Sequence, residues 1–135
     1  MILTGVLKRV GGGITDRSRS GPTFIDALEV AGHPEIRNVR GTRYIIDHVG
    51  SAVGKKVSIG ILGKAIVAVK HDEGFYQDES LASLIISNAP LLIAGIVICV
   101  PLVMWSTLAG AALLAIMYFY FRMRVRAVFA AVAGA

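Results

Sequence analysis

One uncharged stretch in the C-terminal half of the chain decides the fold. Residues 80–121 read SLASLIISNAPLLIAGIVICVPLVMWSTLAGAALLAIMYFYF and contain no Asp, Glu, Lys, Arg or His. A helix needs about 20 apolar residues to cross a bilayer, so this stretch has room for two spans. As a single helix it would be about 60 Å long, twice the hydrocarbon thickness. The stretch therefore predicts a transmembrane helical hairpin over residues 79–121, with one tilted helix as the alternative.

The expected break in the hairpin lies near Pro101, within residues 100–107. Proline removes a backbone donor there, and Ser106 or Thr107 can cap the following helix. If the alternative holds and proline only kinks one helix, the C-terminus lies on the other side of the membrane. Small residues recur at helical spacing in the two spans, which indicates close packing within the hairpin or between copies. The residues concerned are Gly95, Ser106, Gly110, Ala111 and Ala115.

A second break signal lies near the start of the uncharged stretch. Ser87 or Asn88 precedes Pro90 and can cap a shorter first helix, with the proline in its first turn. Residues 81–87 would then lie along the membrane interface.

Aromatic and basic residues flank the spans, as is typical of membrane interfaces. They are Trp105, Tyr118, Tyr120, Arg122, Arg124 and Arg126. The three arginines open a basic juxtamembrane tail over residues 122–135, and the expected turn between the spans carries no charge. By the positive-inside rule, we expect the N-terminal unit and the C-terminus both to be cytoplasmic. The protein is therefore expected to lie in the bacterial inner membrane, with the lipid bilayer as one of its partners.

The composition separates this hydrophobic part from a polar N-terminal unit, residues 1–78. Of the 135 residues, 55% are hydrophobic and 17% charged, which excludes a disordered tail, and the single cysteine excludes a disulfide scaffold. The length excludes an enzyme with separate cofactor and substrate domains. All nine acidic residues lie at or before Glu79, with eleven of the fourteen basic ones, so residues 1–80 have a net charge of 11 − 9 = +2.

Glycine-separated apolar runs in the N-terminal unit predict short strands. They cover residues 2–10, 23–30, 36–39, 57–62 and 64–69, with Gly63 as a hairpin turn. Residues 44–49 fit either a strand or a short helix. So many strands in so short a unit predict an antiparallel sheet that closes on itself, because a small open sheet leaves its edges exposed.

The order of these segments carries a resemblance. A strand over residues 24–30 leads to R-N-V-R-G at 37–41, then V-G-S-A-V-G-K-K-V-S-I at 49–59 and V-A-V-K at 67–70. This pattern resembles the small OB-like β-barrels over residues 1–78. The resemblance implies a five-stranded barrel, a fold that binds oligonucleotides or sugars or serves as an assembly module. The predicted fold class is therefore an α+β membrane protein, a small antiparallel OB-like β-barrel followed by a two-helix transmembrane hairpin.

No motif for catalysis or metal binding emerges. The segment 50–56 is one residue short of a phosphate-binding P-loop, and Lys56 stands where a Ser or Thr must bind magnesium. His33, His48 and His71 do not have metal-ligand spacing, and no Gly-x-Ser-x-Gly is present. We expect no catalytic residue, no cofactor, no metal and no enzymatic activity.

The basic residues of the N-terminal unit form the remaining candidate site. A surface for an anionic ligand or a partner is expected at Arg37, Arg40, Arg43, Lys55 and Lys56. An alternative anion-binding loop is the glycine run 11–13 before Arg17 and Arg19. Nucleic acid is a disfavoured partner, because the nine acidic residues dilute the positive field.

These features predict a non-enzymatic accessory or assembly subunit of a membrane complex. Its transmembrane helices would oligomerise and its barrel would contact a partner. Two alternatives remain open: a ligand-sensing membrane effector or pore-forming subunit, and a membrane-tethered nucleic-acid-binding protein.

Overall fold

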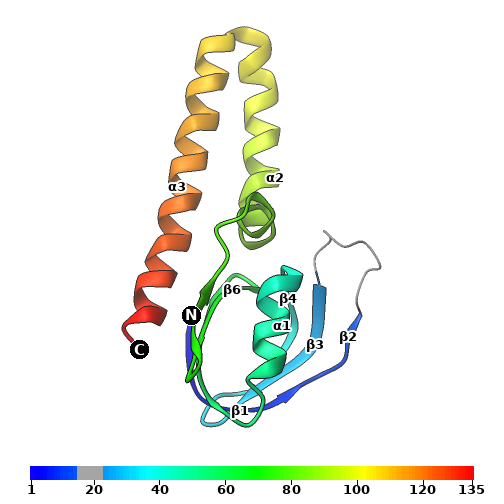
Figure 1. Cartoon of the computed structure of the whole chain (residues 1–135). Coiled ribbons are helices and arrows are strands. Elements are labelled where there is room, and N and C mark those ends of the chain that lie inside the picture. Colours follow the sequence, from blue (N-terminus) through cyan, green and yellow to red (C-terminus); the bar gives the residue numbers. More distant parts are fainter. Residues whose placement is uncertain (15–22) are drawn as a thin grey trace.

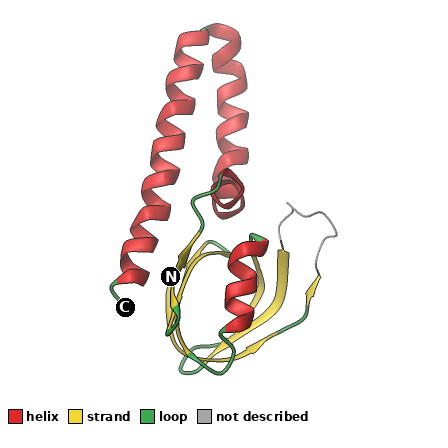
Figure 2. Cartoon of the chain, in the orientation of Figure 1, coloured by secondary structure: helices red, strands yellow, loops and turns green. Residues whose placement is uncertain are grey.

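The computed structural model describes residues 1–14 and 23–135, which form a β-sheet followed by two long helices (Figures 1 and 2). The strands are β1 (Ile2–Val10), β2 (Gly13–Ile14), β3 (Thr23–Val30), β4 (Ile36–Gly41), β5 (Lys56–Leu62), β6 (Ala65–His71) and β7 (Gly74–Gln77). The helices are α1 (Arg43–Ser51), α2 (Leu81–Trp105) and α3 (Thr107–Ala133). Arg17 and Arg19 of the expected anion-binding loop lie outside the described residues.

The strand pairings run in a ring that is not evenly arranged about one axis. The order β1-β5-β6-β4-β3 returns to β1 through a direct pairing of β3 with β1. The predicted antiparallel sheet is confirmed, with one parallel contact, where Arg40 of β4 lies opposite Ala65 of β6. The short strands β2 and β7, which the sequence did not predict, extend the sheet beside β3 and β6.

Apolar side chains that alternate along the strands point into one core. Leu3 and Leu7 of β1 and Ile25 and Leu28 of β3 are almost fully buried. The segment left open between strand and helix is helical: α1 buries one face of Ile45, Ile46 and Val49 against this core. Their spacing of three and four residues suits a helix and not a strand, whose faces alternate every second residue.

The last third of α3 packs on the outside of the sheet. Val125, Phe129 and Val132 recur every three or four residues and are buried in a cluster that includes Leu62, Val67 and Ala68 of β5 and β6. Phe121, one turn earlier, is also buried. Gly60 makes this close approach possible, because a Cβ atom there would lie 2.6 Å from Val128 Cγ1 and 2.7 Å from Val132 Cγ2. Residues 122–133, which belong to the predicted juxtamembrane tail, continue the same helix, and this helix joins the apolar segment to the sheet.

The two long helices lie side by side as a hairpin (Figure 1). Both are long and apolar enough to cross a membrane. The break between them falls at Ser106 and not at Pro101, because α2 continues helical to Trp105. Ser106 has extended backbone angles, and its Oγ accepts a hydrogen bond of 3.4 Å from the Ala109 N–H. An N-cap that satisfies a free backbone donor therefore sets the turn.

Asn88 divides α2 into two segments. Its φ of −115° and ψ of 15° are not helical, so the first two turns lie across the rest of the helix, and Figure 1 shows them end-on. Its Nδ2 donates to the Leu84 carbonyl and to Ser87 Oγ, both at 3.0 Å. Asn88 thus terminates the first segment, while Pro90 lies in the first turn of the second.

Candidate functional site

The polar groups of interest gather where the hairpin begins, beside the sheet. The start of α2 is fixed by Asp78, whose carboxylate accepts a 2.8 Å hydrogen bond from the Ser80 N–H and a second from the Thr42 hydroxyl. Ser80 Oγ in turn accepts from the Ser83 N–H at 3.2 Å, so it is the N-cap of the helix. Thr42 precedes α1, so Asp78 joins the hairpin to the β4–α1 corner of the sheet.

An open pocket of about 630 Å³ lies between this part of the hairpin and the sheet. Three basic residues line it: Arg40 from β4, Lys64 from the β5–β6 turn and Arg124 from α3. The kink of α2 forms another wall through Ser87 and Asn88. The more apolar part of the lining consists of Phe24, Pro90 and Leu91.

The strand pairing of β4 places Arg40 in this pocket. Its backbone N–H donates to the Lys64 carbonyl at 2.9 Å, beside the parallel contact with Ala65. Asn38, which also lines the pocket, has a φ of 55°, a left-handed conformation that asparagine tolerates better than most residues. The arginine is half-buried, and its Nε is buried without a hydrogen-bond partner among the described residues.

The pocket has a net positive charge. No Asp or Glu is among the described residues that line it. Within residues 1–14 and 23–135, Arg40, Lys64 and Arg124 take part in no ion pair. Arg124 lies with its Cζ 5.9 Å from the centroid of the Tyr120 ring, a cation–π contact that leaves its charge uncompensated.

The structure does not bring the five expected basic residues together. Arg37 pairs with Glu35 at 2.5 Å and is highly exposed, and Arg43 pairs with Asp47 at 3.8 Å along α1. Lys55 pairs with the turn that follows β6, whereas Arg40 lies beside the first residue of that strand. Seven strand residues separate the two ends by about 20 Å.

Two members of the cationic pocket were missed or given another role. Lys64 was predicted only as the first residue of a strand, and Arg124 only as an interface anchor. The charge pattern that singled out the arginines at 37, 40 and 43 does not show which of them the hairpin approaches. The convergence depends on the docking of α3 and on the kink at Asn88, neither of which is a property of one segment.

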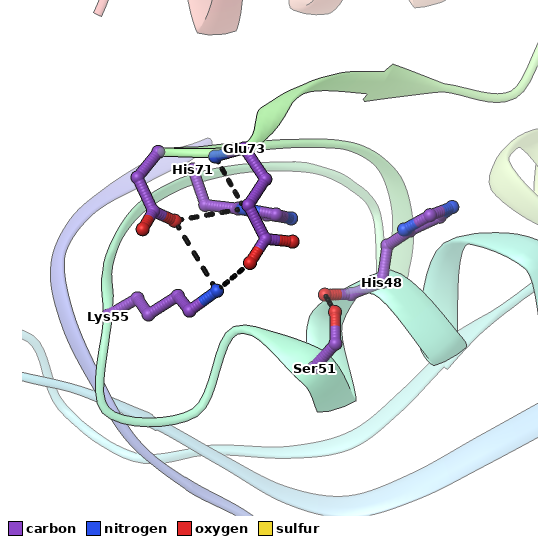
Figure 3. Close-up of polar contacts among 6 residues, drawn as sticks. His48, Ser51, Lys55, His71 and Glu73 are labelled. Atoms are coloured by element: carbon purple, nitrogen blue, oxygen red, sulfur yellow. Dashed lines mark hydrogen bonds and ion pairs between the residues drawn. The ribbon is translucent and has the colours of Figure 1, made fainter.

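A second polar cluster lies at the other end of β6 (Figure 3). Lys55 Nζ is 3.6 Å from Asp72 Oδ1 and also hydrogen bonds to Glu73. The bond to Glu73 raises the pKa of Lys55, with partial desolvation acting in the opposite direction. Desolvation raises the pKa of Asp72, but the His71 hydrogen bond and the Lys55 ammonium together hold it below its ordinary value. The positive charge of Lys55 is therefore compensated within this cluster.

His71 is buried within that cluster. Its Nδ1 lies 3.2 Å from Asp72 Oδ1 and 3.2 Å from the backbone nitrogen of Glu73, while its Nε2 is buried without a partner among the described residues. Tyr76 of β7 stacks between His71 and His48, with ring centroids 5.1 and 3.7 Å away. Across the described part of the chain, no group of three or more His, Cys, Asp or Glu is placed to hold a metal ion.

The expected helix-packing residues separate into two groups. Gly95 and Gly110 are buried in the hairpin, and a Cβ atom on Gly95 would overlap the Met117 thioether. Ala111 and Ala115 are exposed on one face of α3. These two alanines are therefore free to contact another helix, while the glycines bring α2 and α3 together.

The expected membrane-interface residues lie at the end of α2 and in the middle of α3. Trp105 is the last residue of α2, and its side chain lies outside the described part of the structure. Tyr118 and Tyr120 are 44% and 51% exposed on α3. Arg122 and Arg126 share Glu79 as an ion-pair partner, at 3.8 and 3.9 Å. Of the three arginines, only Arg124 lines the cationic pocket.

Comparisons of the chain with protein-family models, with curated proteins and with solved structures find no match. The function of the protein is therefore inferred from its own contacts, burial and charges.

Proposed function

We propose that the protein is a non-enzymatic accessory or assembly subunit of a membrane complex. In this proposal the α2–α3 hairpin crosses the bilayer and the sheet contacts a partner protein. The observation that carries it is the continuity of α3, which runs from the uncharged segment to the sheet and buries Phe121, Val125, Phe129 and Val132. A domain attached in this way is held at a set position above the membrane, as an assembly module requires.

We further propose that the sheet is an OB-like barrel. Strands β1, β3 and β4 follow one another, and β5 returns to lie beside β1, which is a Greek-key order. Strand β6 then pairs with both β5 and β4. Five strands in a partly open Greek-key ring are what an OB-like barrel requires, and such barrels include assembly modules as well as ligand binders.

The proposed location is the bacterial inner membrane, with the sheet and the C-terminus in the cytoplasm. Its support is the distribution of charge. The basic residues within 1–14 and 23–135 all lie at the sheet end of the hairpin, and the turn at Ser106 is flanked by uncharged residues. Loops rich in Lys and Arg stay on the cytoplasmic side of a membrane.

The exposed face of α3 supports oligomerisation. Ala111 and Ala115 lie one helical turn apart and are exposed, a spacing at which small residues let two helices approach closely. Replacement of both by leucine is expected to reduce the oligomer size in mild detergent. The matched control is Ala94→Leu with Ala112→Leu, which adds the same bulk at two other exposed alanines. An unchanged size in the first variant would contradict this interface.

The first test of the proposal is purification of the tagged full chain from its native membrane in mild detergent, followed by measurement of mass and identification of co-purifying proteins. A stable complex with other subunits is the expected result. A homogeneous assembly of this chain alone would contradict the accessory role and favour a pore or sensor. Conductance across liposomes would then separate those two.

The second candidate, a ligand-sensing membrane effector, is favoured by one specific observation. The pocket at Arg40, Lys64 and Arg124 combines uncompensated positive charge with a volume typical of small-molecule sites. A membrane-tethered nucleic-acid binder has less support, because Arg37, Arg43 and Lys55 are each paired with an acidic side chain. Salt-dependent binding of an oligonucleotide by the full chain would reverse this order.

A further inference from the structure

The cationic pocket combines three features that point to one ligand chemistry. The first is charge: three basic groups from three different elements converge without an acidic partner among the described residues. Some basic residues elsewhere on the sheet do pair with carboxylates, as Lys8 does with Glu29 and Lys55 with Asp72. An arrangement of this kind fits an anion with several oxygen atoms, and phosphate is the anion that arginine and lysine commonly bind in proteins.

The second feature is a pair of buried polar atoms without partners. Arg40 Nε is an N–H donor and Asn88 Oδ1 is an acceptor, and both residues line the pocket. The orientation of the Asn88 amide follows from its bonds, since its Nδ2 must face the Leu84 carbonyl to donate to it. A buried group without a hydrogen bond is costly, so a ligand that satisfies both atoms is favoured. Such a ligand accepts from the arginine and donates to the asparagine.

The third feature is position. Arg124 lies three residues beyond the uncharged stretch, and Pro90 and Leu91 open the longer segment of α2. The pocket is therefore at the level where the hairpin would enter the bilayer. Its lining changes there from charged and polar groups to Phe24, Pro90 and Leu91. A phospholipid changes in the same way, from a charged headgroup to apolar acyl chains.

We propose that this pocket binds a phosphate ester that carries a free hydroxyl group, as in the headgroup of an anionic glycerophospholipid. The phosphate oxygens accept from Arg40, Lys64 and Arg124, and the hydroxyl donates to Asn88 Oδ1. The lipid source rests on the proposed membrane anchoring, whereas a soluble glycerol phosphate has the same chemistry and does not. A bound lipid would couple the position of the sheet to the composition of the membrane.

The experiment is native mass spectrometry of the full chain in non-ionic detergent with equal amounts of phosphatidylglycerol and phosphatidylcholine. We expect one phosphatidylglycerol to be retained in preference to phosphatidylcholine. Arg40→Gln with Arg124→Gln should weaken its apparent affinity by about 30-fold, since each cation near an anionic lipid contributes a factor of roughly five. The matched control, Arg37→Gln with Arg126→Gln, removes one arginine from each of the same two elements and should stay within about threefold.

Two results would overturn the site: equal losses in both double variants, which would indicate general surface charge, or no loss in either. If the first double variant does not fold, Lys64→Gln replaces it. Lys64 is exposed in a turn, and its loss should lower the affinity by about fivefold.

Two further measurements answer separate questions. The first asks whether the phosphate ester is a lipid or a soluble molecule, and the second asks whether the protein is anchored in the membrane. The lipid-free protein is tested for binding of sn-glycerol 3-phosphate. If it binds this ester, loses the binding when Arg40 and Arg124 are replaced, and retains no lipid, the phosphate site is supported and its ligand is a soluble ester. Alkaline extraction of native membranes tests anchoring by itself. Release of the protein there would contradict the membrane anchor and leave the phosphate chemistry standing on the binding data.

Discussion

A single added methyl group at Gly60 tests whether α3 is docked on the sheet. Gly60 lies in β5 and does not have a positive φ, so alanine fits its backbone. The new Cβ would lie 2.6 Å from Val128 Cγ1 and 2.7 Å from Val132 Cγ2, whereas ordinary contacts begin at 3.4 Å. Helix and strand must therefore separate by about 3.4 − 2.6 = 0.8 Å. Valine side chains are stiff at χ1, so they cannot rotate away.

The cost follows from this overlap. Inserting an extra carbon into a packed interface costs about 1–3 kcal/mol. Replacement of glycine lowers the entropy of the unfolded chain and returns about 0.4–1 kcal/mol. We expect Gly60→Ala to lower the free energy of unfolding by about 1–2 kcal/mol, the difference between these contributions. The local opening of α3 from the sheet should become about tenfold more frequent for each 1.4 kcal/mol lost.

The assay combines denaturant unfolding in detergent with the rate of trypsin cleavage after Arg126, which lies in the docked part of α3. The matched control is Gly50→Ala in α1, where no heavy atom lies within 4 Å of the new Cβ, so the stability should stay constant or rise. In the Val132→Ala background one of the two overlaps disappears, and a coupling energy of about 0.5 kcal/mol or more is expected. If Gly60→Ala matched the control in both stability and cleavage, the docking of α3 on β5 would be refuted.

Three other perturbations test contacts outside this interface. Asp78→Ala leaves the Ser80 N–H and the Thr42 hydroxyl without their acceptor, so it should lower the free energy of unfolding by about 1–3 kcal/mol. Asp78→Asn keeps one side-chain oxygen and should recover part of this loss in the same denaturant titration. The lowered pKa of Asp72 means that its contribution to stability is present above pH 3.8 and is lost as the pH falls below that value. The raised pKa of Lys55 has the opposite sign, so its contribution to stability is present below pH 10.5 and is lost as the pH rises further. The free energy of unfolding of Lys55→Met should therefore differ most from that of the native chain between these two pH limits. A constant difference at every pH would contradict the ion pairs.

The strands of the polar unit were predicted well because their signal is local. Residues 2–10 and 23–30 form β1 and β3 with the expected bounds, since alternate apolar residues must face one core. The hairpin breaks within the expected residues 100–107, at Ser106, one of the two residues predicted to cap the second helix. Pro101 itself lies inside α2, because a proline removes only one backbone hydrogen bond there, whereas Ser106 leaves the helical conformation and caps the next helix. Residues 44–49 stayed open because six residues hold too little of either period to distinguish a helix from a strand.

The cationic pocket was only partly accessible to such reasoning. Arg40 was selected as one of five basic residues, but four of them lie elsewhere on the surface and are exposed or paired with acids. Lys64 and Arg124 had no feature that linked them to Arg40. Their convergence depends on a parallel contact between β4 and β6 and on a helix that returns from the far end of the hairpin to the sheet. The spacing of residues within one segment predicts neither this contact nor the return of the helix.

The amino-acid sequence alone determined that this chain has a polar, strand-rich unit followed by two apolar helices. That result needs only the distribution of charge and the local periodicity of apolar residues, which act within one element at a time. The tertiary structure decided that the second helix continues past its apolar part to dock at Gly60, and that Arg40, Lys64 and Arg124 then face one pocket. Those outcomes depend on which surfaces meet, and packing between distant segments is selected by the shape of both partners together.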